Sequence, residues 1–103
     1  MQSNNHHQLF MKTKFNIALI GGRGYVGQEI IHILNQHPNF ELCKAFSRTA
    51  AETEVDGYNQ LPTLKYSLLE DSNLDLDNID IAILALSNGD SNKYVTEIDL
   101  KYP

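Results

Sequence analysis

Apolar residues gather in three short runs along this chain, and the segments between the runs are polar or amphipathic. The first two runs, Phe15–Ile20 and Phe40–Phe46, have the length and the β-forming residues of buried strands. Between them, apolar residues recur at helical spacing on what we predict to be one face of a helix: Val26, Ile30, Ile33 and Leu34. We predict this helix over about Gly24–Gln36. It should end at His37-Pro38, because a residue before proline is disfavoured in the α region.

The third run, Ile79–Leu86, is almost continuously apolar, which is typical of a strand covered on both faces of a parallel sheet. A helix should follow over about Asp90–Leu100. Of the segments in between, Ser47–Gln60 and Asp71–Asn78 are interpreted as solvated surface loops, while Leu64–Leu69 fits a short strand or a helix. This order predicts an α/β fold, a Rossmann-like parallel sheet with flanking helices. The sheet is expected to be incomplete, with only the first half of a doubly wound fold.

Composition and charge narrow the classes of partner. The formal net charge is −5 and the 8 Lys and Arg residues are scattered, which argues against a nucleic-acid surface. No apolar run reaches the roughly 18–20 residues that a membrane-spanning helix needs. The polar start lacks the features of a signal peptide, and residues 1–13 are expected to be a disordered tail. Cys43 is the only cysteine, so no internal disulfide can form and a cytoplasmic location is expected.

The stretch Ile17–Gly27, IALIGGRGYVG, joins the first strand to the first helix through a turn with four glycines. Gly22, Gly24 and Gly27 match G-x-G-x-x-G, and Gly21 with the last two matches G-x-x-G-x-x-G. In this motif one glycine makes the tight turn, Gly24 lets a pyrophosphate approach, and Gly27 packs helix on strand. The alternative is a turn that only connects two elements. The candidate cofactor-binding residues of this loop are Gly21, Gly22, Arg23, Gly24, Tyr25, Val26 and Gly27.

Two further candidate sites follow predicted strands. Ser47-Arg48-Thr49 comes where an NAD-binding chain usually has a carboxylate for the ribose 2′-hydroxyl. An arginine and two hydroxyls complement a 2′-phosphate instead, so the expected cofactor is NADP. Glu52 and Glu54 come slightly late for the ribose role and leave NAD as an alternative. Ser87-Asn88-Gly89 follows the third run and makes either a cofactor contact or an ordinary capping turn.

With these motifs in order, the chain resembles the N-terminal part of the N-acetyl-γ-glutamyl-phosphate reductase family of arginine biosynthesis. The resemblance covers roughly Lys14–Pro103 and rests on IALIGGRGYVG, QEIIHILNQHP, the triplet Phe46-Ser47-Arg48 and IDIAILALSNG. It implies that the glycine loop holds pyrophosphate and that the Ser-Arg pair meets the adenosine 2′-phosphate. It also implies that Ser87 and Gly89 contact the cofactor.

This chain departs from the family pattern at two places. The family usually has alanine where this chain has Gly22. The turn after the third apolar run often reads Pro-His-Gly in the family, whereas this chain has Ser87-Asn88-Gly89, which leaves Asn88 without an implied role.

The resemblance also implies a chemistry. Members of the family are similar to aspartate-semialdehyde dehydrogenase: a cysteine thiolate attacks an acyl phosphate, phosphate leaves, and hydride from NADPH reduces the resulting thioester to an aldehyde. The catalytic cysteine and histidine are then expected downstream, so residues 14–103 would be the dinucleotide-binding domain of a longer oxidoreductase. That enzyme would take a small acyl phosphate and form a homo-oligomer. The alternatives are an aspartate-semialdehyde dehydrogenase-like enzyme and a free-standing, non-catalytic dinucleotide-binding module.

Overall fold

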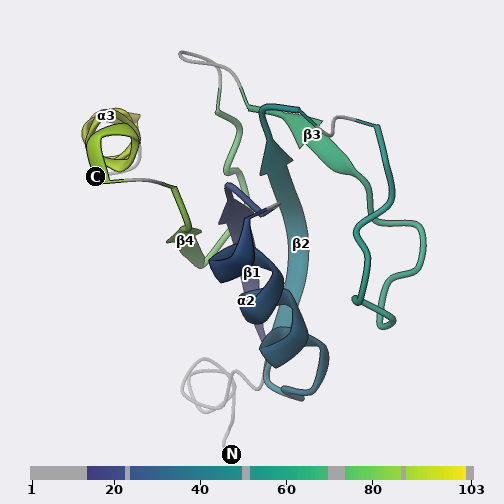
Figure 1. Cartoon of the computed structure of the whole chain (residues 1–103). Helices are drawn as coiled ribbons and strands as arrows, with labels where there is room; N and C mark the ends of the chain where they lie inside the picture. Colours follow the sequence, from purple (N-terminus) through teal and green to yellow (C-terminus); the bar gives the residue numbers. More distant parts are fainter. Residues whose placement is uncertain (1–13, 23, 50–51, 70–73, 87, 102–103) are drawn as a thin grey trace, which may run out of the picture.

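A computed structural model describes residues 14–22, 24–49, 52–69, 74–86 and 88–101. In this part of the chain, four parallel strands form one sheet in the order β3-β2-β1-β4, flanked by two helices (Figure 1). The elements in chain order are β1 (Phe15–Ile20), α2 (Tyr25–Asn35), β2 (Phe40–Ser47), β3 (Tyr66–Leu68), β4 (Ile81–Leu84) and α3 (Asn88–Lys101). The predicted Rossmann-like α/β fold is confirmed, and so is the first β-α-β unit.

The ends of the later elements differ from the prediction. β4 has four residues, fewer than the predicted run Ile79–Leu86, because the Ile79 N–H donates to the Leu76 carbonyl and closes a turn before the strand. The ambiguous segment Leu64–Leu69 contains a strand, since β3 pairs with Ala45–Ser47. Helix α3 begins at Asn88, two residues before its predicted start.

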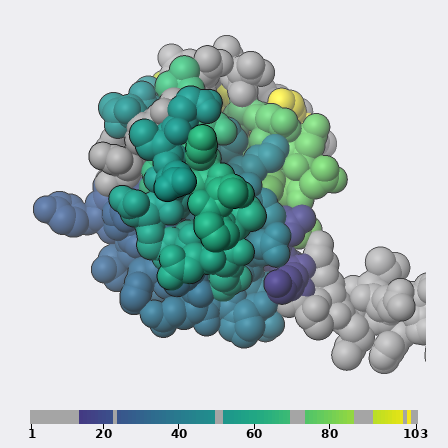
Figure 2. All heavy atoms as spheres, turned by 90° about the vertical axis from the view of Figure 1, so that its right-hand side faces the viewer, coloured from purple at the N-terminus to yellow at the C-terminus, as the bar shows by residue number. Residues whose placement is uncertain are grey.

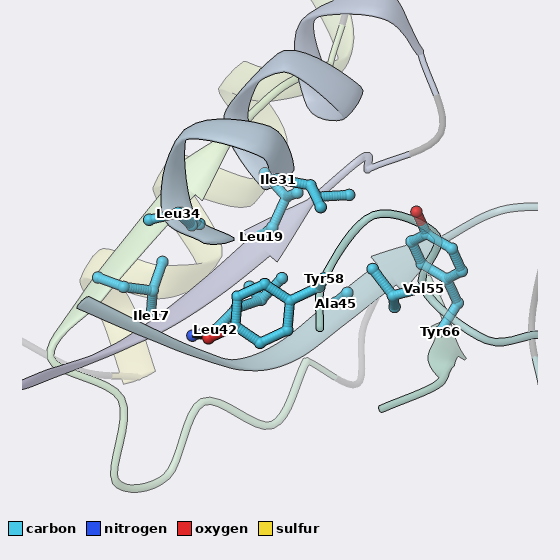
Figure 3. Close-up of a cluster of buried hydrophobic side chains, with 9 residues drawn as sticks. All are labelled: Ile17, Leu19, Ile31, Leu34, Leu42, Ala45, Val55, Tyr58 and Tyr66. Atoms are coloured by element: carbon cyan, nitrogen blue, oxygen red, sulfur yellow. Dashed lines mark hydrogen bonds between the residues drawn. The ribbon is translucent and has the colours of Figure 1, made fainter. Parts of the chain in front are cut away.

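One half of the core lies between α2 and the sheet (Figure 3). Ile31 and Leu34 of α2 point toward Ile17 and Leu19 of β1, which are almost fully buried. The predicted apolar face of the helix was therefore only partly right. Side chains of Val26 and Ile33 are 64% and 57% exposed, whereas the buried positions are Gly27, Ile31 and Leu34. The glycine belongs to the packed face because it lets the helix approach the chain beneath it.

The other half of the core lies on the opposite face of the sheet. Strand residues alternate between faces, so Ala18 and Ile20 of β1 pack there with Tyr94 of α3. The segment predicted as a solvated loop, Asp71–Asn78, contributes Leu74 and Leu76 to this half, and both are buried. That prediction was wrong for the two leucines, which alternate with exposed aspartates.

β4 is the last strand of the sheet on its side among the described residues. Its first residue, Ile81, is 40% exposed, and Ile83 on the same face is half-buried. The prediction of a strand covered on both faces therefore holds only in part. The described residues contain no helix long and apolar enough to cross a membrane.

The predicted surface loop Ser47–Gln60 is also partly buried. Val55 and Tyr58 are 6% and 2% exposed and pack in the α2 half of the core. The Tyr58 hydroxyl accepts the N–H of Leu42 at 2.9 Å, which fixes the segment to β2. Figure 2 shows the chain from residue 52 to 69 spread over this side of the molecule. Polar composition alone missed these two anchoring residues.

Candidate cofactor site

Three segments that are far apart in the sequence meet where the parallel strands β1, β2 and β4 end. They line a shallow, open cavity of about 220 Å³. Its lining residues are Gly21 and Gly24 after β1, Ser47, Arg48 and Thr49 at and after the end of β2, and Ala85 and Leu86 after β4. The Ala85 N–H donates to the Ile20 carbonyl at 2.8 Å, which holds the end of β4 beside the end of β1. Open α/β sheets bind ligands at this edge.

Gly21 and Gly27 are required by the fold itself. Gly21 has a φ of +92°, and a Cβ there would lie 2.6 Å from Leu86 Cδ2. A Cβ on Gly27 would lie 2.6 to 2.7 Å from backbone atoms of Gly22, so α2 can pack on the loop only without it. These two glycines shape the turn and seat the helix.

Gly24 has no such structural reason to be glycine. It is the N-cap of α2, and its φ of −77° and ψ of 179° are open to any residue. A Cβ at Gly24 would meet nothing within 4 Å. The space beside Gly24 adjoins the cavity, where a ligand could approach the backbone.

The first turn of α2 is suited to an anion. The four N–H groups at a helix start have no intrahelical acceptor, and the helix dipole adds a partial positive charge there. In α2 no side chain caps these groups, and the first turn holds no acidic residue. The Gly21 and Gly22 N–H groups, by contrast, both donate to the Phe46 carbonyl, at 2.9 and 3.3 Å. An anion would therefore meet the amides of the helix start and not those of Gly21 and Gly22.

Gly22 lies beneath the loop against Tyr66. A Cβ there would lie 2.9 Å from Tyr66 Cε1 and 3.2 Å from Leu19 Cδ2. Tyr66 is 2% exposed, and its hydroxyl lies within 3.4 Å of both the Gly22 carbonyl and Gln28 Nε2. The alanine that the resemblance leads one to expect at residue 22 would push into this ring.

We expect Gly22→Ala to lower the free energy of unfolding by about 1–3 kcal/mol, the usual cost of overpacking. Gly24→Ala, which meets open space, is the matched control and should cost less than about 1 kcal/mol. Urea unfolding of both variants measures the difference. The shorter side chain of Tyr66→Leu should make Gly22→Ala cheaper in the double variant; equal stabilities of Gly22→Ala and the parent would contradict the packing argument.

The end of β2 places a serine and an arginine on the cavity. Ser47 is 3% exposed, and its Oγ accepts the Thr49 N–H at 3.2 Å. Arg48 is exposed, and its Nη2 donates to the hydroxyl of Tyr94 at 3.2 Å. Tyr94 lies on α3, and no motif in the sequence marks it as a site residue. The structure thus brings Ser47 and Arg48 to the same cavity as Gly21 and Gly24.

Other predicted cofactor residues lie outside the cavity lining. Tyr25 is 95% exposed and Val26 is also exposed, so only their backbone, in the first turn of α2, is near the site. Gly89 is the second residue of α3. Arg23 and Ser87 lie outside the described residues.

Cys43 has the wrong environment for a nucleophile. It is the extra residue at an irregularity between β1 and β2, and it does not line the cavity. Burial, together with the nearby Glu41 carboxylate, raises the pKa of the Cys43 thiol, which disfavours the reactive thiolate. Among the described residues, no group of three His, Cys, Asp or Glu side chains could hold a metal ion.

Residues 16–101 match the family described as "Semialdehyde dehydrogenase, NAD binding domain". The chain belongs to this family. The match spans β1 to the end of α3, so it includes the glycine loop, the end of β2 and the turn after β4. NAD binding is the property that the family description names.

Two bacterial relatives of this semialdehyde dehydrogenase domain carry the name of the reductase family that the sequence resembles. "N-acetyl-gamma-glutamyl-phosphate reductase" of Xanthomonas oryzae is 34% identical over 89 residues, which are 84% of this chain and 28% of the relative. The Bifidobacterium longum protein of the same name is 33% identical over 89 residues, 84% of this chain and 24% of the relative. "Protein arg-6, mitochondrial" of Neurospora crassa is 36% identical over 91 residues, 85% of this chain and 10% of the relative. The chain thus spans less than a third of each relative.

A solved structure has a similar fold. The structure titled "Crystal Structure of Aspartate Semialdehyde Dehydrogenase with NADP from Candida albicans" aligns with a TM-score of 0.61 over 82% of this chain and 26% of that chain. The two sequences are 19% identical over the alignment, so the likeness concerns the fold.

Proposed function

We propose that this chain is the NADP-binding part of an N-acetyl-γ-glutamyl-phosphate reductase, which reduces an acyl phosphate to a semialdehyde. Two bacterial relatives with that name support the proposal at 33% and 34% identity across more than four fifths of the chain. The motif residues that suggested the family also lie around one cavity.

The observation that carries the binding role is the open space at Gly24. Neither backbone conformation nor packing requires glycine at this N-cap, which supports a ligand that approaches the helix start. The uncapped first turn of α2 supplies N–H groups and a partial positive charge for a pyrophosphate. Gly21 and Gly27 act indirectly, since they shape the loop and seat the helix.

The choice of NADP is supported by the end of β2. Ser47 and Arg48 line the cavity where an NAD-binding chain would have a carboxylate for the ribose. A guanidinium pairs with a phosphate dianion in a strong, charge-assisted contact. Arg48 would therefore meet the 2′-phosphate, with the buried Ser47 beside it.

Bound NADPH would supply the hydride for the reduction of a thioester. This chain's own residues bind and orient the cofactor, and none of the cavity-lining side chains is a nucleophile of the cysteine type. Cys43 does not fill that role, given its raised pKa and its place away from the cavity. As the family resemblance implies, the cysteine nucleophile and the histidine acid/base would then lie after residue 103.

We also propose domain bounds, an oligomeric state and a location. By the family resemblance, residues 14–103 would be the dinucleotide-binding domain; residues 1–13, predicted as a tail, lie outside the described residues. The full-length enzyme would be a homo-oligomer. A cytoplasmic location fits the single free cysteine, whereas the Neurospora crassa relative is named as mitochondrial.

Turnover of the full-length protein tests the reaction. With NADP and phosphate, we expect oxidation of N-acetylglutamate semialdehyde with a kcat/KM at least about tenfold above that for aspartate semialdehyde. A site that hydrogen-bonds a polar group of its substrate discriminates against an analogue that lacks this group. NADPH formation is the readout. A preference for aspartate semialdehyde would favour the sister enzyme, and binding of NADP without turnover of either aldehyde would favour a non-catalytic module.

A further inference from the structure

Arg48 is held in place by a buried side chain of another element. Its Nη2 donates to the Tyr94 hydroxyl at 3.2 Å, and its Cζ lies 5.9 Å from the centroid of the Tyr94 ring. Tyr94 belongs to α3, 46 residues later in the chain. The guanidinium thus lies at the hydroxyl end of the Tyr94 ring, within cation–π range of its centroid.

Tyr94 is a rigid anchor for this contact. It is fully buried, and it packs with Ala18, Ile20 and Phe46 of the sheet on the α3 face. An arginine at an exposed position normally samples many rotamers, and ordering it costs side-chain entropy. A fixed ring that accepts a hydrogen bond reduces that cost before any ligand arrives.

Tyr94 itself does not line the cavity, whereas Arg48 does. Tyr94 therefore acts on a ligand only through other residues, and the Arg48 guanidinium is the cavity-lining group to which its hydroxyl is hydrogen-bonded. A second cation, the Lys93 ammonium, lies 5.3 Å from the centroid of the same ring.

We propose that Tyr94 is a positioning residue for cofactor selectivity: it orients Arg48 toward the 2′-phosphate and so makes the preference for NADP depend on α3. The inference rests on the proposed NADP-binding function. It adds Tyr94 of α3, a residue to which the sequence motifs assign no role.

Tyr94→Phe tests this, because it keeps the ring and its packing and removes only the hydroxyl that accepts the hydrogen bond. In the full-length protein we expect the Kd for NADP to rise by about three- to tenfold, the worth of one such hydrogen bond. The Kd for NAD should stay within a factor of about two, because NAD has no 2′-phosphate for Arg48 to meet. The selectivity ratio is thus a readout that loss of general stability would not move.

Two controls complete the experiment. Tyr58→Phe removes another buried tyrosine hydroxyl that is hydrogen-bonded, on the α2 side of the sheet, and should leave both Kd values unchanged. In an Arg48→Ala background, Tyr94→Phe should have no further effect on NADP. An equal loss of NADP affinity with and without Arg48, or an unchanged Kd in the single variant, would overturn the positioning role. If the parent protein binds NADP and NAD equally, the proposed cofactor preference fails instead.

Discussion

Gly24→Val should abolish cofactor binding while leaving the fold intact. The valine Cβ and its methyl groups would occupy the open space at the start of α2, where the pyrophosphate must approach. Loss of two or more charge-assisted hydrogen bonds, each worth about 1.5–3 kcal/mol, predicts a rise in Kd of at least about 100-fold. Calorimetric titration of the full-length variant with NADP measures it.

The stability of the same variant separates the two explanations of this glycine. Its extended backbone accepts valine, and no neighbour lies within 4 Å of the new Cβ, so the free energy of unfolding should fall by no more than about 1 kcal/mol. Gly27→Val is the contrasting variant, because its Cβ would lie 2.6 Å from the Gly22 backbone, and it should not fold stably. Undiminished NADP binding by Gly24→Val would mean that the glycines only shape a turn.

Arg48→Ala should remove the preference for NADP. The guanidinium is the only cationic side chain that lines the cavity among the described residues. Its contact with the 2′-phosphate, worth about 1.5–3 kcal/mol, predicts a Kd for NADP that rises on the order of tenfold to a few hundredfold. The Kd for NAD should hardly change.

Competition titrations with both cofactors measure the two constants in one preparation. Lys44→Ala is a matched control, because Lys44 is a cation on β2 that pairs with Asp75 and does not line the cavity. It should leave the NADP-to-NAD ratio unchanged. Equal weakening of NADP and NAD by Arg48→Ala would show that the arginine supports the loop and does not read the 2′-phosphate.

Local sequence patterns predicted most of the fold, because an apolar run, a glycine turn or a proline each restricts the backbone of its own segment. The apolar run at Phe15–Ile20, the glycine turn and the stop at His37-Pro38 together defined the first β-α-β unit. Hydrophobic spacing was less informative about the buried face of α2, because the deciding residue, Gly27, is not hydrophobic and acts by its lack of a side chain.

Parts of the structure that depend on long-range contacts could not be read from the sequence. Val55 and Tyr58 sit in a polar segment, and only the folded chain shows that they pack against β2 and α2. Tyr94 is of the same kind, since its contact with Arg48 joins residues 46 positions apart.

The candidate site was predictable where glycines and strand ends mark it. Gly21, Gly24, Ser47 and Arg48 line one cavity, as parallel strands bring their carboxyl ends together. The sequence could not separate the glycines that the fold requires from the one that it does not. That distinction comes from what a Cβ would touch at each position.

We propose that the cavity at the ends of β1, β2 and β4 binds NADP in preference to NAD. Calorimetric titration of the unmodified full-length protein with each cofactor tests this preference. Given one additional charge-assisted contact at Arg48, we expect NADP to bind at least about tenfold more tightly than NAD. Equal Kd values, or tighter binding of NAD, would contradict it.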